Sequence, residues 1–127
     1  MDNKDTQQTT PGIKYDAGKE DFSLIPVKPL LKLAQLFTVG AKKYGVRNWE
    51  KGIAYSRLFS AMMRHAWKYW GGETHDPVDG QHHLDAVVWN AMCLREMEDV
   101  HPELDDRTSN NVRFTDSASM YEDKNNE

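Results

Sequence analysis

Residues 80 to 100 constrain the fold of this chain more than any other segment. Plotted at 100° per residue, their apolar side chains go nearly all the way round a helix. These side chains are Leu84, Val87, Val88, Trp89, Ala91, Met92 and Leu94. We therefore expect a helix that is buried on most sides. Asp85 and Asn90 lie inside this apolar stretch, so each needs a hydrogen-bond partner or a cation.

Two further segments have helical periodicity. In residues 29 to 44, apolar side chains recur every three or four positions, with Pro29 in the first turn and Gly45 just past the end. Residues 55 to 70 carry an apolar stripe and, on the opposite side, a basic face. The stripe comprises Phe59, Met62, Met63, Ala66, Trp67 and Trp70, and the basic face comprises Arg57, Arg64 and Lys68. No segment indicates a convincing strand, so the expected fold is all-α, a small antiparallel helical bundle.

The hydrophobic core that three helices can form is small, so a partner chain is expected to stabilise it. The three helices span about 75 residues, and a core below roughly 80 residues rarely stabilises itself generously. Four tryptophans and five tyrosines offer a large apolar area to a partner. We therefore expect a homo-oligomer, a dimer or tetramer, that completes the bundle. The lone Cys93, among apolar neighbours, is expected to be a packed thiol rather than a nucleophile.

Charge divides the chain unevenly. Residues 96 to 127 hold ten of the twenty acidic residues but three of the sixteen basic ones, so they carry −7 and the first 95 residues carry +3. We expect a disordered polar arm over 1–13, a helical domain over 14–101 and an acidic, disordered tail over 102–127, whose removal leaves function intact. Neither a signal region nor a membrane span is evident, which predicts a cytoplasmic protein, in the host cytoplasm if a phage encodes it.

The densest polar cluster lies between Arg64 and Asn90. Glu73 and Asp76 are three residues apart, which on a helical turn points both carboxylates toward one cation. Because Pro77 disfavours helical dihedrals at Asp76, the pair can instead lie in a connecting turn. Oxygen-rich clusters with some imidazole suit Mg²⁺ or Mn²⁺ better than structural zinc. The alternative is that these acids cap a turn and the third helix, with Asp79 as the N-cap.

Other residues suit an anionic nucleotide. Lys19 and Lys43 lie near glycines and are candidate phosphate contacts, although such loops are more often solvated turns. Tyr44 and Trp49 can stack on a purine or pack in the core. Arg64, beside His65, can neutralise a triphosphate or remain a surface arginine.

Taken in chain order, these pieces resemble the phage and bacterial dATP/dGTP diphosphohydrolases, which are related to the MazG-like all-α nucleoside triphosphate pyrophosphatases. The resemblance covers about residues 14 to 95. It rests on Asp16-x-Gly18-Lys19, Ser23-Leu24-Ile25-Pro26, Gly40-Ala41-x-Lys43-Tyr44-Gly45, Asn48-Trp49, Arg64-His65, Gly72-Glu73-x-x-Asp76, and His83-Leu84 through Asn90.

The resemblance implies a metal-dependent enzyme that cleaves a purine deoxynucleoside triphosphate, dGTP or dATP, into the monophosphate and pyrophosphate. Glu73, Asp76 and Asp85 would hold Mg²⁺ or Mn²⁺, and His65 or His83 would act as a further ligand, a base or a phosphate donor. The substrate contacts would be Asp16, Lys19, Lys43, Tyr44, Asn48, Trp49, Arg64 and Asn90. The chain lacks the usual ExxE pair of the MazG-like enzymes, so a partner subunit can be needed to complete the site.

Two other functions compete with this one. His75-Asp76, with His65 upstream, suggests an HD-type phosphohydrolase, although the spacing is compressed for that fold. The basic face of residues 55 to 70 suggests a small phage DNA-binding or inhibitor protein. The first 95 residues carry a net charge of only +3, and no helix-turn-helix pair is evident. Both observations argue against a stable nucleic-acid partner.

Overall fold

The structure is a computed structural model, and it describes residues 11 to 108. Within that range, three α-helices follow one another: α1 (Val27–Tyr44), α2 (Tyr55–Trp70) and α3 (His83–Val100). Three short 3-10 helices accompany them: η2 (Phe22–Leu24), η3 (Asn48–Lys51) and η4 (Pro102–Leu104). The all-α class is therefore confirmed. Most of the expected arm and tail lies outside the described residues.

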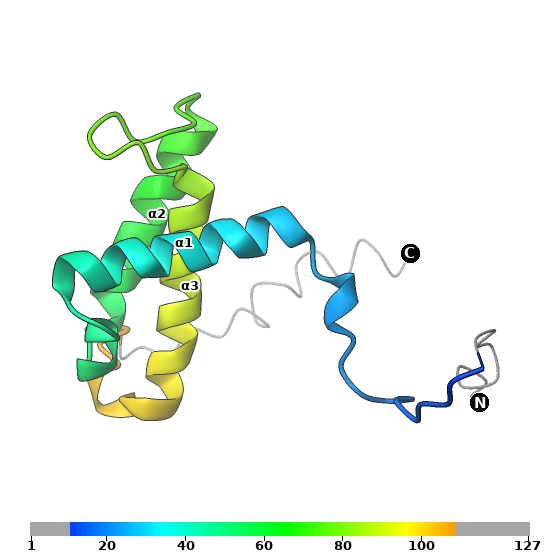
Figure 1. The fold of residues 1–127 in the computed structure, drawn as a ribbon. Helices are drawn as coiled ribbons and strands as arrows, with labels where there is room; N and C mark the ends of the chain where they lie inside the picture. Colours follow the sequence, from blue (N-terminus) through cyan, green and yellow to red (C-terminus); the bar gives the residue numbers. More distant parts are fainter. Residues whose placement is uncertain (1–10, 109–127) are drawn as a thin grey trace, which may run out of the picture.

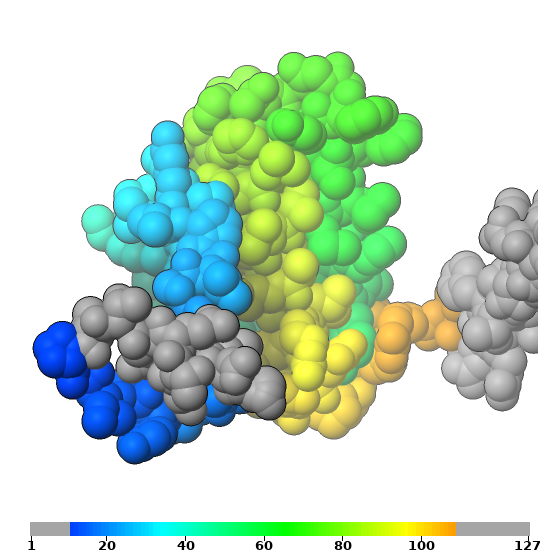
Figure 2. All heavy atoms as spheres, turned by 90° about the vertical axis from the view of Figure 1, so that its right-hand side faces the viewer, coloured from blue at the N-terminus to red at the C-terminus, as the bar shows by residue number. Residues whose placement is uncertain are grey.

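The helices pack around α3. α2 and α3 run antiparallel, and α1 crosses this pair instead of joining it as a third antiparallel helix (Figure 1). The view from the side shows α3 between α1 and α2 (Figure 2). The segment that precedes α1 extends away from the bundle (Figure 1). No helix among residues 11 to 108 has the length and apolar character that a membrane crossing requires.

The start of α3 differs from the prediction. α2 has the expected bounds, but α3 begins at His83 rather than at residue 80. The cap is His82, whose imidazole accepts a hydrogen bond from the backbone N–H of Leu84, so Asp79 is not the N-cap. Gly80 explains the shift, because its φ of 75° is left-handed and incompatible with a helix. The Asp79 carboxylate instead accepts from the N–H of Gln81 within the loop.

The core lies on one face of α3. Its buried residues recur every three or four positions: His83, Ala86, Asn90, Cys93 and Met97. Cys93 and Met97 pack against Tyr55 and Leu58 of α2. Burial raises the pKa of the Cys93 thiol to about 12, which confirms a packed thiol. Asn90 has the partner it needs, because its side-chain N–H donates to the carbonyl of Ala86.

Two predicted apolar surfaces are exposed in the single chain. Leu84, Val88 and Met92 of α3 are 39 to 48% exposed, and the buried residues of α3 lie on one face, so the expectation of burial on most sides is wrong for one copy. On α2, part of the predicted stripe faces solvent: Phe59, Met63, Trp67 and Trp70 are 43 to 79% exposed. Because successive residues of a helix are 100° apart, these four side chains lie on one face of α2. We call them the α2 stripe.

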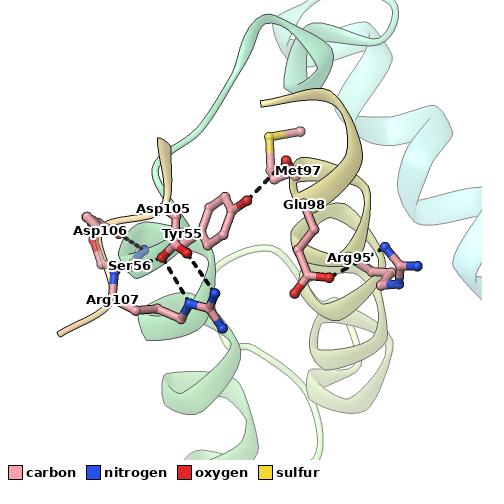
Figure 3. A network of polar contacts seen from close by, with 8 residues as sticks. All are labelled: Tyr55, Ser56, Arg95, Met97, Glu98, Asp105, Asp106 and Arg107. Carbon is pink, nitrogen blue, oxygen red and sulfur yellow. Dashed lines mark hydrogen bonds and ion pairs between the residues drawn. The ribbon is translucent and has the colours of Figure 1, made fainter. Parts of the chain in front are cut away.

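The segment after α3 packs back on the bundle. Leu104 of η4 contacts the core, and the Asp106 carboxylate accepts hydrogen bonds from the backbone N–H and the hydroxyl of Ser56. Arg107 pairs with Asp105 beside the Tyr55 ring (Figure 3). The Tyr55 hydroxyl in turn donates to the Met97 carbonyl at 3.2 Å. We therefore propose that the helical unit ends after Arg107 rather than at residue 101.

Two truncations test this boundary. A chain ending at residue 108 is expected to melt like the full chain. A chain ending at residue 101 loses the contacts of Leu104 and Asp106, and its melting temperature is expected to fall by about 10 °C, which corresponds to about 2 kcal/mol of lost apolar burial. Thermal melts followed by circular dichroism measure the difference. Equal melting temperatures would contradict the proposed boundary.

Candidate functional site

The loop between α2 and α3 brings acidic residues back to the start of α3. Gly72 has a φ of 109°, and the N–H of Glu73 then donates to the carbonyl of Lys68. Farther along, the N–H of Asp76 donates to the carbonyl of Gln81, and the N–H of His83 donates to that of Thr74. Glu73 and Asp76 therefore lie in a connecting loop rather than on a helical turn. The backbone hydrogen bonds fix the path of this loop.

Three side chains from different elements meet at the base of this loop. His65 comes from α2, Asp76 from the loop and His83 from the first turn of α3. Each offers a ligand atom, and these atoms all lie within 4.8 Å of one another. The Nδ1 atoms of the two imidazoles are 2.8 Å apart. His83 is fully buried, and His65 and Asp76 are half-buried, so the three residues can together hold a metal ion. We call them the His–Asp–His cluster.

Glu73 contacts this cluster from outside. Its carboxylate lies 2.7 Å from Nε2 of His83. A carboxylate accepts hydrogen bonds, so Nε2 of His83 donates to it; in the neutral imidazole, Nδ1 then presents its lone pair toward His65. Carboxylates commonly orient metal-binding histidines in this way. Glu73, expected to be a direct ligand, is instead placed as the partner of His83.

Both of the other cluster residues are held in the form that binds a cation. Burial lowers the pKa of the His65 imidazole, and the neighbouring His83 lowers it further, so His65 is neutral at pH 7. The backbone N–H of Val78 donates to the Asp76 carboxylate at 2.8 Å and lowers its pKa. Asp76 is therefore ionised. A neutral imidazole and an ionised carboxylate are the ligating forms.

A cavity of about 930 Å³ lies between α1, η3, α2 and α3. It contains five residues predicted to contact substrate: Tyr44, Asn48, Trp49, Arg64 and Asn90. The basic face of α2 contributes Arg57 and Arg64 to its wall. Trp49 contacts both the core and the cavity, so its two predicted roles are compatible.

One residue of the cavity wall and one of the cluster are consecutive on α2. Arg64 lines the cavity and donates to the Ser60 hydroxyl, and the next residue, His65, belongs to the cluster. Along α2, Arg57 and Arg64 are two turns apart, about 10 Å at 1.5 Å per residue. The wall of the cavity is therefore cationic over a length that suits several phosphates.

Sequence reasoning missed three residues that line the cavity. Arg47 has a left-handed φ of 55° and lies over the Trp49 ring. Arg57 belongs to the basic face predicted for residues 55 to 70, but it is not among the residues predicted to contact substrate. The indole N–H of Trp89 is buried, and residues 11 to 108 offer it no acceptor. In the sequence, only its position next to Asn90 points to Trp89 as a site residue. Because its other neighbours are apolar, the sequence does not distinguish Trp89 from a core residue.

Some predicted site residues lie elsewhere. Asp16 and Lys19 form an exposed turn ahead of α1 and do not reach the cavity, because their segment extends away from the bundle (Figure 1). Lys43 is exposed, with its ammonium over the Tyr44 ring, near the cavity but not in its wall. Asp85, two residues after His83, points to another side of α3 and lines a different cavity with α1.

The position of His75 tests the HD-type phosphohydrolase alternative. That function requires His75 and Asp76 as joint ligands. His75 instead faces His82, with ring centroids 5.1 Å apart, and pairs with it as an isolated antiparallel bridge. Among the described residues, the cluster includes Asp76 but not His75. The geometry therefore does not favour an HD-type centre.

Comparisons with known proteins agree on one family. The family model described as dATP/dGTP diphosphohydrolase, N-terminal, matches residues 9 to 107. A dATP/dGTP diphosphohydrolase from Salmonella phage PMBT28 is 33% identical over 96 residues, which cover 76% of this chain and 33% of that protein. The chain thus spans about a third of the length of the curated relative it matches. No solved structure matches the chain.

Proposed function

Because the chain belongs to the dATP/dGTP diphosphohydrolase family, we propose that it hydrolyses dGTP, dATP or both to the monophosphate and pyrophosphate. The observation that carries the proposal is that Arg64, in the wall of the cationic cavity, and His65, in the His–Asp–His cluster, are consecutive residues of α2. A triphosphate needs both parts: a pocket for the nucleoside and a place where charge on phosphate is neutralised.

The cluster fits a divalent cation, Mg²⁺ or Mn²⁺, by its donor chemistry. Two imidazole nitrogens and a carboxylate oxygen converge, the pKa of Asp76 is lowered so that its carboxylate is ionised, and burial lowers the pKa of His65, which favours its neutral form. A cation bound there neutralises phosphate charge and lowers the pKa of water. His65, Asp76 and His83 would hold it, and Glu73 would fix the ring of His83.

Residues of the cavity would hold and orient the nucleotide. The rings of Tyr44 and Trp49 offer apolar faces to a purine, and the Asn48 and Asn90 amides can bond to the sugar or base edges. Arg57 and Arg64 would bind the phosphates and aim the α phosphorus at the cluster. Asp16 and Lys19 would contribute only if their segment folded over the cavity.

A panel of deoxynucleotides tests the proposed reaction. The purified protein is incubated with each dNTP and Mg²⁺ or Mn²⁺, and the products are identified by chromatography. We expect equal amounts of pyrophosphate and monophosphate, preferentially from dGTP or dATP. Release of orthophosphate, or no turnover with either metal, would contradict the proposal.

Arg64 has a predictable role in substrate binding. Replacing Arg64 with alanine is expected to lower kcat/KM by about ten- to a hundredfold, because a hydrogen bond to a charged group contributes about 1.5 to 3 kcal/mol. Arg95 provides the control: it is exposed on α3, where it pairs with Glu98 and Asp99. Arg95→Ala should keep parental kinetics. Equal losses in the two variants would show a general effect of charge rather than binding at Arg64.

We also propose that copies of this chain associate through the α2 stripe, as a dimer or tetramer. The stripe exposes two tryptophans, 72 and 79% accessible, and exposed apolar patches of this kind commonly mark interaction surfaces. Light scattering coupled to size-exclusion chromatography should give an oligomer for the parent. The double variant Trp67→Glu, Trp70→Glu should give a monomer, whereas Val78→Glu, at another exposed apolar position, should not. A monomeric parent at high concentration would contradict this.

A further inference from the structure

The donor atoms of the His–Asp–His cluster differ from those expected of a magnesium site. We propose that His65, Asp76 and His83 form a centre that selects a first-row transition metal such as Mn²⁺ against Mg²⁺, with Glu73 as the residue that positions His83. The proposal rests on the proposed function only in that the reaction uses a divalent cation. Of the two ions expected for the reaction, Mg²⁺ and Mn²⁺, it selects the transition metal.

The ligand types of the cluster favour one class of ion. Two of the three converging groups are imidazoles, and one is a carboxylate. Mg²⁺ prefers oxygen ligands and gives up its bound water reluctantly. Imidazole is a common ligand of Zn²⁺, Fe²⁺ and Ni²⁺; Mn²⁺ binds such sites least strongly of the first-row divalent ions, but it accepts imidazole in place of water more readily than Mg²⁺ does. Mg²⁺ and Mn²⁺ carry the same charge, so the Asp76 carboxylate attracts both. The discrimination therefore comes from His65 and His83.

The spacing of the two imidazoles suits a shared ion. Their Nδ1 atoms are 2.8 Å apart. Metal–nitrogen bonds of about 2 Å that lie at right angles to each other place the two nitrogens about 3 Å apart. Such a pair occupies adjacent positions on a six-coordinate ion and, with one carboxylate, leaves other positions for water or phosphate oxygens. Without an ion, a proton on one Nδ1 atom holds the same two atoms together.

Glu73 decides which form of His83 faces the ion. Because Nε2 of His83 lies 2.7 Å from the Glu73 carboxylate, the proton stays on Nε2 and the Nδ1 lone pair faces the cluster. His83 is fully buried, so it has no freedom to turn toward water. His65 has only to carry its own proton on Nε2 to present Nδ1 as the second nitrogen ligand.

Binding of Mn²⁺ without nucleotide tests the proposal directly. The full chain is stripped with a chelator, and free Mn²⁺ is followed by electron paramagnetic resonance during a titration. We expect saturable binding that survives about a hundredfold excess of Mg²⁺. Loss of the bound Mn²⁺ to that excess of Mg²⁺, or no saturable binding at all, would overturn the proposal.

Matched variants assign the binding to these residues. His65→Ala should weaken Mn²⁺ binding at least about tenfold, and Glu73→Gln, which keeps the side-chain volume, should weaken it about tenfold or more. His75→Ala removes an imidazole of the same region that lies outside the cluster, and should bind like the parent. Circular dichroism confirms that each variant is folded. Parental binding by His65→Ala, or lost binding by His75→Ala, would overturn the assignment.

The two proposals can fail separately. Normal, His65-dependent Mn²⁺ binding without hydrolysis of any dNTP would contradict the proposed function and leave the metal centre intact. Hydrolysis that proceeds while Mg²⁺ displaces Mn²⁺ from the cluster would contradict the metal selectivity and leave the function intact.

Discussion

Replacing Asp76 with asparagine is expected to lower turnover of the preferred dNTP by about a thousandfold. The substitution removes the negative ligand of the His–Asp–His cluster, and loss of the bound cation forfeits several kcal/mol of transition-state stabilisation. The asparagine side-chain oxygen can still accept from the N–H of Val78, so the loop should keep its conformation. Steady-state kinetics with the parental nucleotide and metal measure the loss.

Asp79 provides the control in the same loop. Its carboxylate accepts from the N–H of Gln81, and it lies outside the cluster. Asp79→Asn therefore makes the same chemical change without touching a ligand, and should retain near-parental turnover. If Asp76→Asn were as active as Asp79→Asn, the catalytic assignment of the cluster would be wrong.

The largest expected effect on stability is at Met97. This side chain is fully buried, where α3 meets Tyr55 and Leu58. Truncation of a buried methionine to alanine leaves a cavity and costs about 2 to 5 kcal/mol, which for a domain of this size lowers the melting temperature by about 10 °C or more. Thermal or denaturant unfolding of Met97→Ala measures the effect.

Met92 provides the control for the substitution at Met97. It lies on the same helix and is 48% exposed. Met92→Ala should therefore cost less than about 1 kcal/mol, since a half-exposed side chain loses less burial and leaves no enclosed cavity. Similar losses at the two positions would show that the face of α3 bearing Met92 is buried against something that the single chain does not supply.

The helices could be predicted because periodicity reports which faces are apolar. It gave the bounds of α2 and the last residue of α1. It did not give the start of α3, because the left-handed Gly80 and the His82 cap are local backbone features without an apolar signal. It also overstated burial, since an apolar side chain such as Trp70 looks alike in sequence whether it faces the core or solvent.

The site was predictable in composition but not in arrangement. Arg64 with His65, and Glu73 with Asp76, were noted as pairs along the chain. The pairing of His65 with His83 depends on the antiparallel packing of α2 and α3, which spacing along one helix does not encode. The resemblance implied Asp85 as a ligand, but a residue two positions from His83 projects from another side of the helix.

We expect water to attack the α phosphorus of a purine deoxynucleoside triphosphate that is bound by the cavity and the cluster. Hydrolysis of dGTP or dATP in ¹⁸O-labelled water tests it, with mass spectrometry of both products. Attack at the α phosphorus places one ¹⁸O atom in the monophosphate and none in pyrophosphate. Label in pyrophosphate would show attack at the β phosphorus, and labelled orthophosphate would show attack at the γ phosphorus. Either result would contradict the account.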